Sequence, residues 1–207
     1  MPKMIIDDQE LEVVSEVHLL GLTLRSDMKW VSNTNNMISK ANKRLWILRR
    51  LKNLGAKIPD LVEVFTKQIR CVLELAAPAW QGAICQAEKQ DLERIQKSAC
   101  HIILGNDYIT YQNALQALHL ETLEDRRLKL TLKFGLKAEK HQKFQKWFKP
   151  NVKSHNTRHH VPKYCPVRAN HARFTKLPDR HVKCALQHEV IHGIEAIQLQ
   201  YTSIPIK

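Results

Sequence analysis

The chain has 207 residues and a formal net charge of +13, from 33 Lys and Arg against 20 Asp and Glu. Apolar residues make up 43% of it, and only 6 Gly and 8 Pro occur, which excludes a fibrous or wholly disordered protein. The sequence has no run of about 18 uncharged apolar residues, so it predicts no membrane-spanning helix.

The start of the chain alternates polar and apolar side chains, which predicts short β-strands. We expect strands at residues 4–6 and 11–14, joined by a polar turn that contains Asp7 and Asp8. A further strand is predicted over residues 17–24.

Helices are predicted where apolar side chains recur every three or four residues. The first has the stripe Met37, Ala41, Leu45, Leu48 and Leu51, and the second has Leu61, Phe65, Ile69, Val72 and Ala76. The predicted ranges are 34–54, 59–77 and about 86–104, followed by shorter helices near 111–118 and 122–141. Gly55 ends the first helix, Pro78 the second and Gly105 the third.

Beyond Pro150 the sequence is rich in Pro, His and basic residues, and its periodicity is weak. It predicts an extended basic arm over residues 150–180 and a last amphipathic helix over 180–200. The expected fold is therefore mainly α, with a small N-terminal β-hairpin followed by a helical bundle and a basic C-terminal arm.

Basic charge is concentrated in two segments. Residues 29–59 hold eight bases and no acid, and residues 126–183 hold 17 bases against two acids. Such an excess predicts a polyanionic partner, with nucleic acid ahead of a membrane. The five widely spaced cysteines are typical of reduced thiols, so we expect an intracellular protein, nuclear or cytoplasmic.

The first long helix has the most informative polar face. At about 100° per residue, Lys43, Trp46 and Arg50 cluster opposite the apolar stripe, and Lys40 and Arg49 flank them. A basic, aromatic and basic strip on a wet face suits phosphates together with a sugar or base edge. The alternative is a solvated basic face with Trp46 packed against another element.

Four blocks of sequence share their order and spacing with a known family. They are Leu20–Leu24 with Trp30 and Ala41–Arg50; Arg70–Trp80; Leu92–Cys100 with Ile102–Gly105; and Leu123–Arg127. Over roughly residues 10–180 they resemble the C-terminal part of reverse transcriptases from non-LTR (LINE-like) retrotransposons. That part follows the catalytic palm and contains the thumb and its helical extension.

The resemblance implies a fragment of an RNA-directed DNA polymerase that uses Mg²⁺. Residues 1–28 would be a β-hairpin remnant of the palm edge, 29–145 the helical thumb and connection domain, and 146–207 a basic His-rich arm with a terminal helix. In the family a thumb helix lies along the minor groove of the primer–template duplex. We therefore expect this chain to bind an RNA–DNA or DNA duplex.

The chemistry of the parent polymerase is not expected here. Two-metal catalysis needs a complete set of carboxylates, and Asp7-Asp8 is the only Asp-Asp pair in the chain. We interpret it as a turn and predict no catalytic residues and no cofactor for the chain itself. The expected nucleic-acid contacts are Lys40, Lys43, Trp46, Arg49, Arg50, Arg126, Arg127, Lys163, Arg168 and Arg173.

Two other interpretations stay open. One is a host-adopted helical module that binds RNA or a protein. The other is a metal-binding module at the His-rich end, where four side chains fall on one helical face: His181, Cys184, His188 and His192. That face equally suits the polar side of an amphipathic helix, so we predict no metal ligands.

Overall fold

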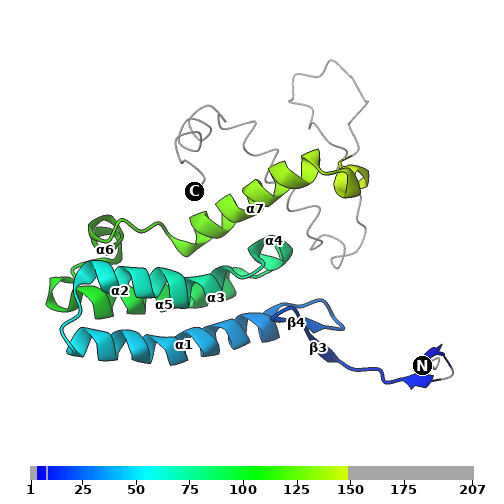
Figure 1. The fold of residues 1–207 in the computed structure, drawn as a ribbon, viewed down its shortest axis with the longest axis horizontal. Helices are drawn as coiled ribbons and strands as arrows, with labels where there is room; N and C mark the ends of the chain where they lie inside the picture. The colour runs from blue at the N-terminus through cyan, green and yellow to red at the C-terminus, as the bar shows by residue number, and fades with distance from the viewer. Residues whose placement is uncertain (1–3, 8, 149–207) are drawn as a thin grey trace, which may run out of the picture. The chain divides into compact units, whose positions relative to one another are not determined.

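The computed structural model describes residues 4–7 and 9–148. This part of the chain is mainly helical with antiparallel strands at its start, which confirms the predicted fold class (Figure 1). The arm predicted over 150–180 and the helix predicted over 180–200 lie outside the described residues.

The chain forms two compact units. Among the described residues, one comprises the chain up to Leu75 together with Ile84–Leu123, and the other comprises Ala76–Ala83 together with residues 124–148. The division between the units thus falls inside the segment 29–145 that we expected to be a single domain.

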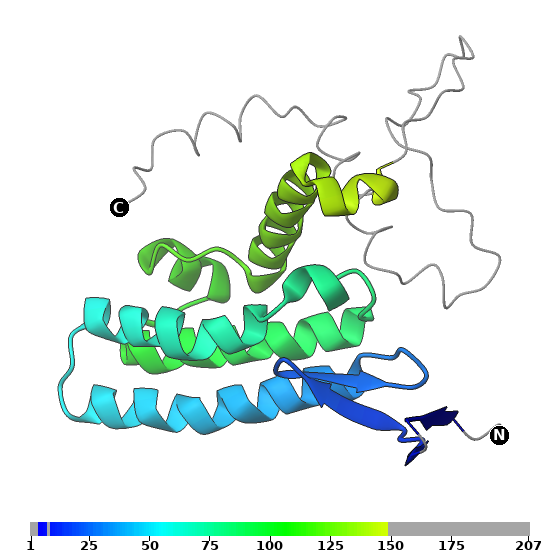
Figure 2. The same ribbon diagram turned by 45° about the vertical axis from the view of Figure 1, so that its right-hand side comes forward.

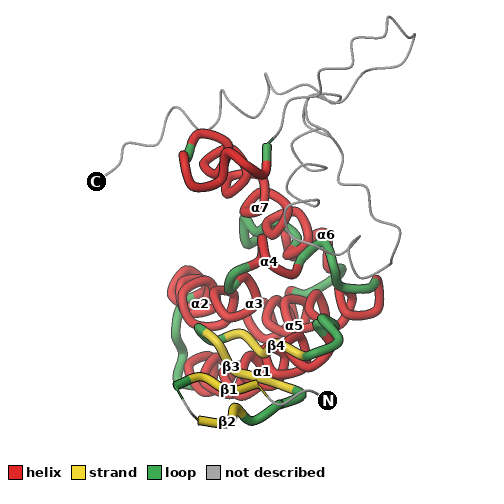
Figure 3. Tube along the Cα trace, turned by 90° about the vertical axis from the view of Figure 1, so that its right-hand side faces the viewer, coloured by secondary structure: helices red, strands yellow, loops and turns green. Residues whose placement is uncertain are grey.

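The N-terminal segment contains two hairpins, whose strands are yellow in Figure 3. In the first, β1 (Met4–Ile6) pairs with β2 (Gln9–Leu11), and Asp7 in the turn has a φ of 47°. In the second, β3 (Glu16–Leu19) pairs with β4 (Leu22–Arg25).

The single strand predicted over residues 17–24 is therefore wrong. The chain reverses at Leu20 and Gly21, which have φ values of 49° and 83°. Successive positive φ values are typical of two-residue hairpin turns, because their twist matches that of the strands. Leucine rarely adopts a positive φ, so a leucine at this position in the sequence does not indicate a turn.

Thr23 attaches the second hairpin to the first turn of α1 (Val31–Asn53). Its amide nitrogen donates to Asn33 Oδ1 at 3.1 Å, and its hydroxyl accepts from Asn36 Nδ2 at 2.9 Å. The hydroxyl also lies 3.1 Å from His18 Nδ1. Because Thr23 and Asn33 are buried, these hydrogen bonds satisfy polar groups that would otherwise lose their water.

A bundle of helices forms the core of the first unit and can be followed in Figure 2. It consists of α1, a middle helix and α5 (Gln86–Leu104), whose bounds agree with the predicted third helix. Thr34 and Glu88, both near the start of their helices, are joined by a hydrogen bond of 3.2 Å. At the other end Lys52 Nζ donates to the carbonyl of Ile103 at 2.8 Å. Helices α1 and α5 are therefore parallel.

The core of this unit confirms much of the predicted apolar stripes. Its fully buried side chains include the predicted Ala41, Leu48, Leu61, Phe65 and Ile69, together with Leu73, Leu92, Ala99 and Ile103, whereas the predicted Leu51 is half-buried and Ala76 is exposed. Burying side chains of this kind contributes about 1.5–3 kcal/mol for each large aliphatic group.

The middle helix changes its geometry along its length. It runs as α2 (Ile58–Val64), a π-helical segment η1 (Phe65–Arg70) and α3 (Cys71–Glu74). Its buried side chains recur at a constant step of four, at Leu61, Phe65, Ile69 and Leu73. In a regular α-helix of 3.6 residues per turn that stripe would drift around the axis, and the wider π-turn cancels the drift. Hence Leu73 is buried where we predicted Val72.

The middle helix also ends earlier than predicted. Ala76 has a φ of 48°, and Pro78 lies in the first turn of a new short helix, α4 (Ala77–Trp80). Proline fits a first helical turn because no donor is needed there. Pro78 therefore starts a helix where we expected it to stop one.

The i,i+4 spacing of Glu63 with Lys67 and of Arg70 with Glu74 predicts two ion pairs on the solvent side of the middle helix, and both pairs are present. Glu63 pairs with Lys67 on the surface, and this contact lowers the pKa of the Glu63 carboxyl. The side chains of Arg70 and Glu74 lie 3.5 Å apart but are only 16% and 12% exposed, so this pair is not on the wet side as predicted.

A polar cluster holds α6 (Tyr111–Ala117) against α5. The Tyr111 hydroxyl donates to Glu93, and it accepts from Gln96 Nε2 at 3.0 Å. Gln96 Nε2 also donates to the Glu121 carbonyl at 2.7 Å, and Glu93 accepts the Leu123 amide at 3.2 Å. Burial, together with Glu93, raises the pKa of Tyr111.

In the second unit, α7 (Leu123–Lys140) packs on residues from α4 and from a 3₁₀ segment. Arg127 is fully buried, and its Nε donates to Gln81 Oε1 at 2.6 Å. Its guanidinium carbon lies 5.8 Å from the centroid of the Trp80 ring. Farther along, Ala138 and Phe148 form a small core with Phe134 and Phe144.

We expect Tyr111→Phe to lower the free energy of unfolding by about 1–3 kcal/mol, because Glu93 and Gln96 both lose a half-buried hydrogen-bond partner. Urea denaturation measures the change. Tyr108→Phe is the matched control, since the Tyr108 hydroxyl makes no hydrogen bond in the described part of the chain and its ring packs on His101. Equal losses in the two variants would contradict a structural role for the cluster.

Alkaline pH should also destabilise the fold. Burial of Cys100 raises the pKa of its thiol from 9.0 to about 11. Between these values the unfolded chain holds fewer protons than the folded chain, so the free energy of unfolding falls as pH rises. Cys100→Ala should remove the decline that begins near pH 9, leaving the decline at higher pH that comes from Tyr111. An unchanged pH profile would contradict this assignment.

Candidate nucleic-acid interface

One face of α1 carries a cluster of exposed cationic side chains. Lys40, Lys43, Arg49 and Arg50 are all exposed, and all belong to the predicted set of nucleic-acid contacts. They lie on this face because Met37, Ala41, Leu45 and Leu48 take the opposite side of the helix into the core. We call these four residues with Trp46 the α1 basic face.

Trp46 lies at the centre of the α1 basic face. Its side chain is 61% exposed, which excludes the alternative that it packs in the core. The Arg50 guanidinium carbon lies 5.8 Å from the centroid of the Trp46 ring, one helical turn away. Such a contact holds the cation over the ring and leaves indole surface open to a ligand.

All charged side chains of α1 are basic, so the α1 basic face has no acidic neighbour on its own helix. No acidic residue occurs from Lys29 to Pro59, and the last turn of α1 carries Arg50 and Lys52. The acids at the start of the unit are partly neutralised, since Arg25 pairs with Asp27 at 3.1 Å and with Glu16 at 3.3 Å. The pKa of the Asp27 carboxyl is lowered, mainly by the hydrogen bond from the Lys29 amide and also by the hydrogen bond and charge of Arg25.

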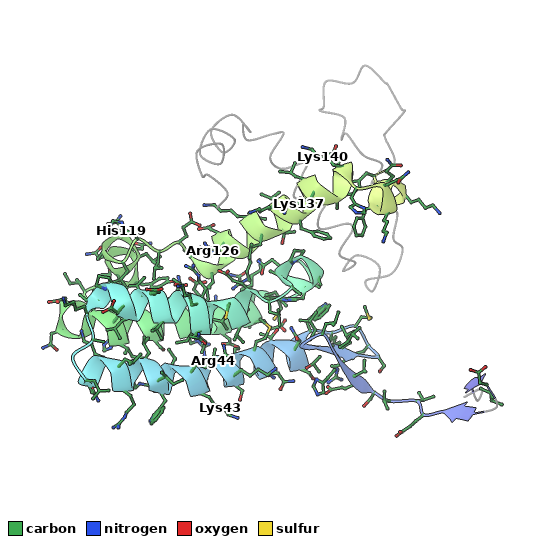
Figure 4. The ribbon with its side chains drawn as sticks, in the orientation of Figure 1. Lys43, Arg44, His119, Arg126, Lys137 and Lys140 are labelled. Carbon is green, nitrogen blue, oxygen red and sulfur yellow. The ribbon has the colours of Figure 1, made fainter. Side chains whose placement is uncertain are left out.

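Arg44 lies next to Lys43 in sequence but points the other way. Figure 4 shows Lys43 on the outer side of α1 and Arg44 directed toward the middle helix. Arg44 donates to the carbonyl of Gln68 inside the π-helical segment. It therefore supports the backbone of the neighbouring helix, and the sequence analysis did not single it out.

Of the remaining predicted contacts, Arg126 and Arg127 belong to the second unit. Arg126 is half-buried in α7, and Arg127 is fully buried against Trp80 and Gln81. The position of Arg127 suits a structural role better than contact with a ligand. Lys163, Arg168 and Arg173 lie outside the described residues, as do the histidines and Cys184 of the alternative metal site.

Among the described residues, no group of three His, Cys, Asp or Glu side chains lies close enough to hold a metal ion. No helix of the described part is long and apolar enough to cross a membrane. No family model, curated protein or solved structure matches this chain.

Because Trp46 is exposed, Trp46→Ala should leave the melting temperature within about 2 °C of wild type, as expected for a surface substitution. Trp80→Ala is the contrasting variant, since Trp80 is fully buried and loss of a buried aromatic side chain costs about 3–5 kcal/mol. Thermal unfolding followed by circular dichroism measures both. A large drop in the melting temperature of the Trp46→Ala variant would show that the Trp46 side chain packs in the core.

Proposed function

We propose that this chain is a nucleic-acid-binding fragment of a LINE-like reverse transcriptase that grips the primer–template duplex through the α1 basic face. The exposure of Trp46 beside Arg50 and Lys43, on a helix without acidic side chains, carries this proposal. The sequence blocks that resemble the thumb of those enzymes support it from a separate direction.

The composition of the face fits this ligand. Lysine and arginine neutralise phosphates and release the counterions that surround them. An exposed indole can stack on a base or lie against a sugar, which is sequence-tolerant because every base has a π-face. Within the α1 basic face, Lys40 and Lys43 precede Trp46 and Arg49 and Arg50 follow it, so the cations lie before and after the ring along the helix.

The proposed role is to hold the duplex and not to extend it. Asp7 lies in the first hairpin turn, and we interpret the Asp7-Asp8 pair as part of that turn, which does not supply the complete set of carboxylates that binds two metal ions. The Mg²⁺ chemistry would therefore belong to the parent polymerase, outside this chain.

A host-adopted module that binds a protein is the second candidate. Ile47 is 45% exposed beside Trp46, so the face offers apolar area as well as charge. Aromatic and Arg side chains are enriched at protein interfaces too. The two candidates differ in their dependence on salt, because only phosphate binding releases condensed counterions.

Duplex binding should weaken steeply with salt, with log K falling linearly against log salt concentration. Lys43→Ala and Arg50→Ala should each reduce that slope by roughly 1 on every sequence tested. Trp46→Ala should leave the slope unchanged and cost about 1–3 kcal/mol of binding free energy. Fluorescence anisotropy with an RNA–DNA hybrid measures all three.

The matched control is Lys67→Ala, because Lys67 is exposed but already paired with Glu63. It should leave the slope near that of the wild type. If the wild-type chain does not bind a duplex even in dilute salt, the nucleic-acid proposal fails. Salt-independent binding to a protein partner that requires Trp46 would favour the host-adopted module.

The isolated chain should incorporate no nucleotide in a primer-extension assay with Mg²⁺ or Mn²⁺, since no three His, Cys, Asp or Glu side chains of the described residues lie close enough to hold a metal ion. A heat-inactivated sample provides the baseline. Incorporation above that baseline would show that the chain carries catalytic groups after all.

A further inference from the structure

A second set of exposed cations lies on α7, in the other unit. Lys133, Lys137 and Lys140 are exposed and are spaced by four and three residues, which places them on one side of the helix. Figure 4 shows Lys137 and Lys140 toward the C-terminal end of α7. We call these three residues the α7 lysine strip.

The strip is exposed because the other side of α7 is already occupied. Phe134 and Ala138 turn toward Phe144 and Phe148 in a small apolar core. The rings of Phe134 and Phe144 meet edge to face, with centroids 6.0 Å apart. This core fixes the rotation of α7 and leaves the three lysines facing solvent.

Nothing in the described chain neutralises the strip. None of its lysines forms an ion pair with a carboxylate among the described residues. Like charges three and four residues apart repel and destabilise a helix. A polyanion bound along the strip would relieve that repulsion, so the strip is suited to such a ligand.

We propose that the α7 lysine strip is a second phosphate-binding face, which contacts the backbone of the nucleic acid bound by this chain. The choice of nucleic acid rests on the proposed function. The strip contains no aromatic residue, so it would contact phosphates without reading or stacking on bases.

The dimensions of the strip match this ligand. From Lys133 to Lys140 the strip covers seven helical steps, or roughly 10 Å at a rise of 1.5 Å per residue. A duplex presents one negative charge per roughly 1.7 Å of its axis, so several phosphates face the strip at once.

A membrane surface fits the strip less well. A helix that lies on a bilayer buries an apolar face in the lipid. On α7 that face is covered by the side chains of Phe144 and Phe148. The large apolar side chains of α7 that stay exposed are Leu136 at 43% and Leu128 at 46%, eight residues apart, which is too little for a continuous apolar face.

The test is the full-length triple variant Lys133→Gln, Lys137→Gln and Lys140→Gln, titrated with a 30-base-pair RNA–DNA hybrid at several salt concentrations. The expected result is a salt slope lower by about 3, since each neutralised phosphate contributes roughly 0.9 to the slope. Affinity at moderate salt should fall at least tenfold. Thermal unfolding verifies that the variant is folded.

A second triple variant, Lys57→Gln, Lys67→Gln and Lys97→Gln, makes the same change in net charge at exposed sites of the first unit. If it lowers the slope as much as the α7 variant, net charge alone explains the effect and the proposal is overturned. An unchanged slope in the α7 variant overturns it as well. Loss of binding to anionic vesicles with an unchanged duplex slope would assign the strip to a membrane instead.

The failure of this inference is distinguishable from failure of the proposed function. If α1 variants weaken duplex binding and the α7 variant does not, only the second face is lost. If the α7 variant lowers the slope and the α1 variants have no effect, the chain binds nucleic acid but not through the α1 basic face.

Discussion

The parallel packing of α1 on α5 is the constraint on which the first unit depends, and Glu88 sets its register. One carboxylate oxygen accepts the Cys85 amide at the start of α5, at 2.8 Å, and the other accepts the Thr34 hydroxyl from α1. A carboxylate at this point also suits the positive end of the helix dipole. Because one side of α1 is fixed against α5 and the middle helix, its opposite side must face solvent. The α1 basic face is thus a consequence of core packing.

Helices with long, regular apolar stripes could be predicted from the sequence, while features that depend on distant partners could not. The bounds of α5 and the buried positions of Leu92 and Ala99 follow from a simple helical period. The π-helical turn does not follow from that period. The constant spacing of four between the buried residues from Leu61 to Leu73 is the sequence feature that indicates it. The hairpin at Leu20 was missed because its turn is fixed by Gly21 and by the attachment of Thr23 to α1, not by the leucine.

The candidate site divides in the same way. The direction of Lys43, Trp46 and Arg50 depends only on their helical angle relative to the stripe, so it could be predicted. Arg127 was taken for a surface cation because its charge is visible in the sequence, whereas its partner Gln81 lies 46 positions earlier. Likewise the cluster of Glu93, Gln96 and Tyr111 consists of ordinary polar residues, which only tertiary structure brings together.

The path of the chain between the units has a consequence for how the molecule can be divided. The segment Ala76–Ala83 leaves the first unit, belongs to the second, and is followed by Ile84–Leu123 back in the first. Neither unit is therefore a continuous piece of polypeptide. If the chain were divided after Leu123, α7 would be separated from Trp80 and Gln81. Those two residues would stay on the piece that contains the first unit, although they belong to the second. During synthesis, the second unit likewise waits for the first to be completed, so its assembly is ordered by topology.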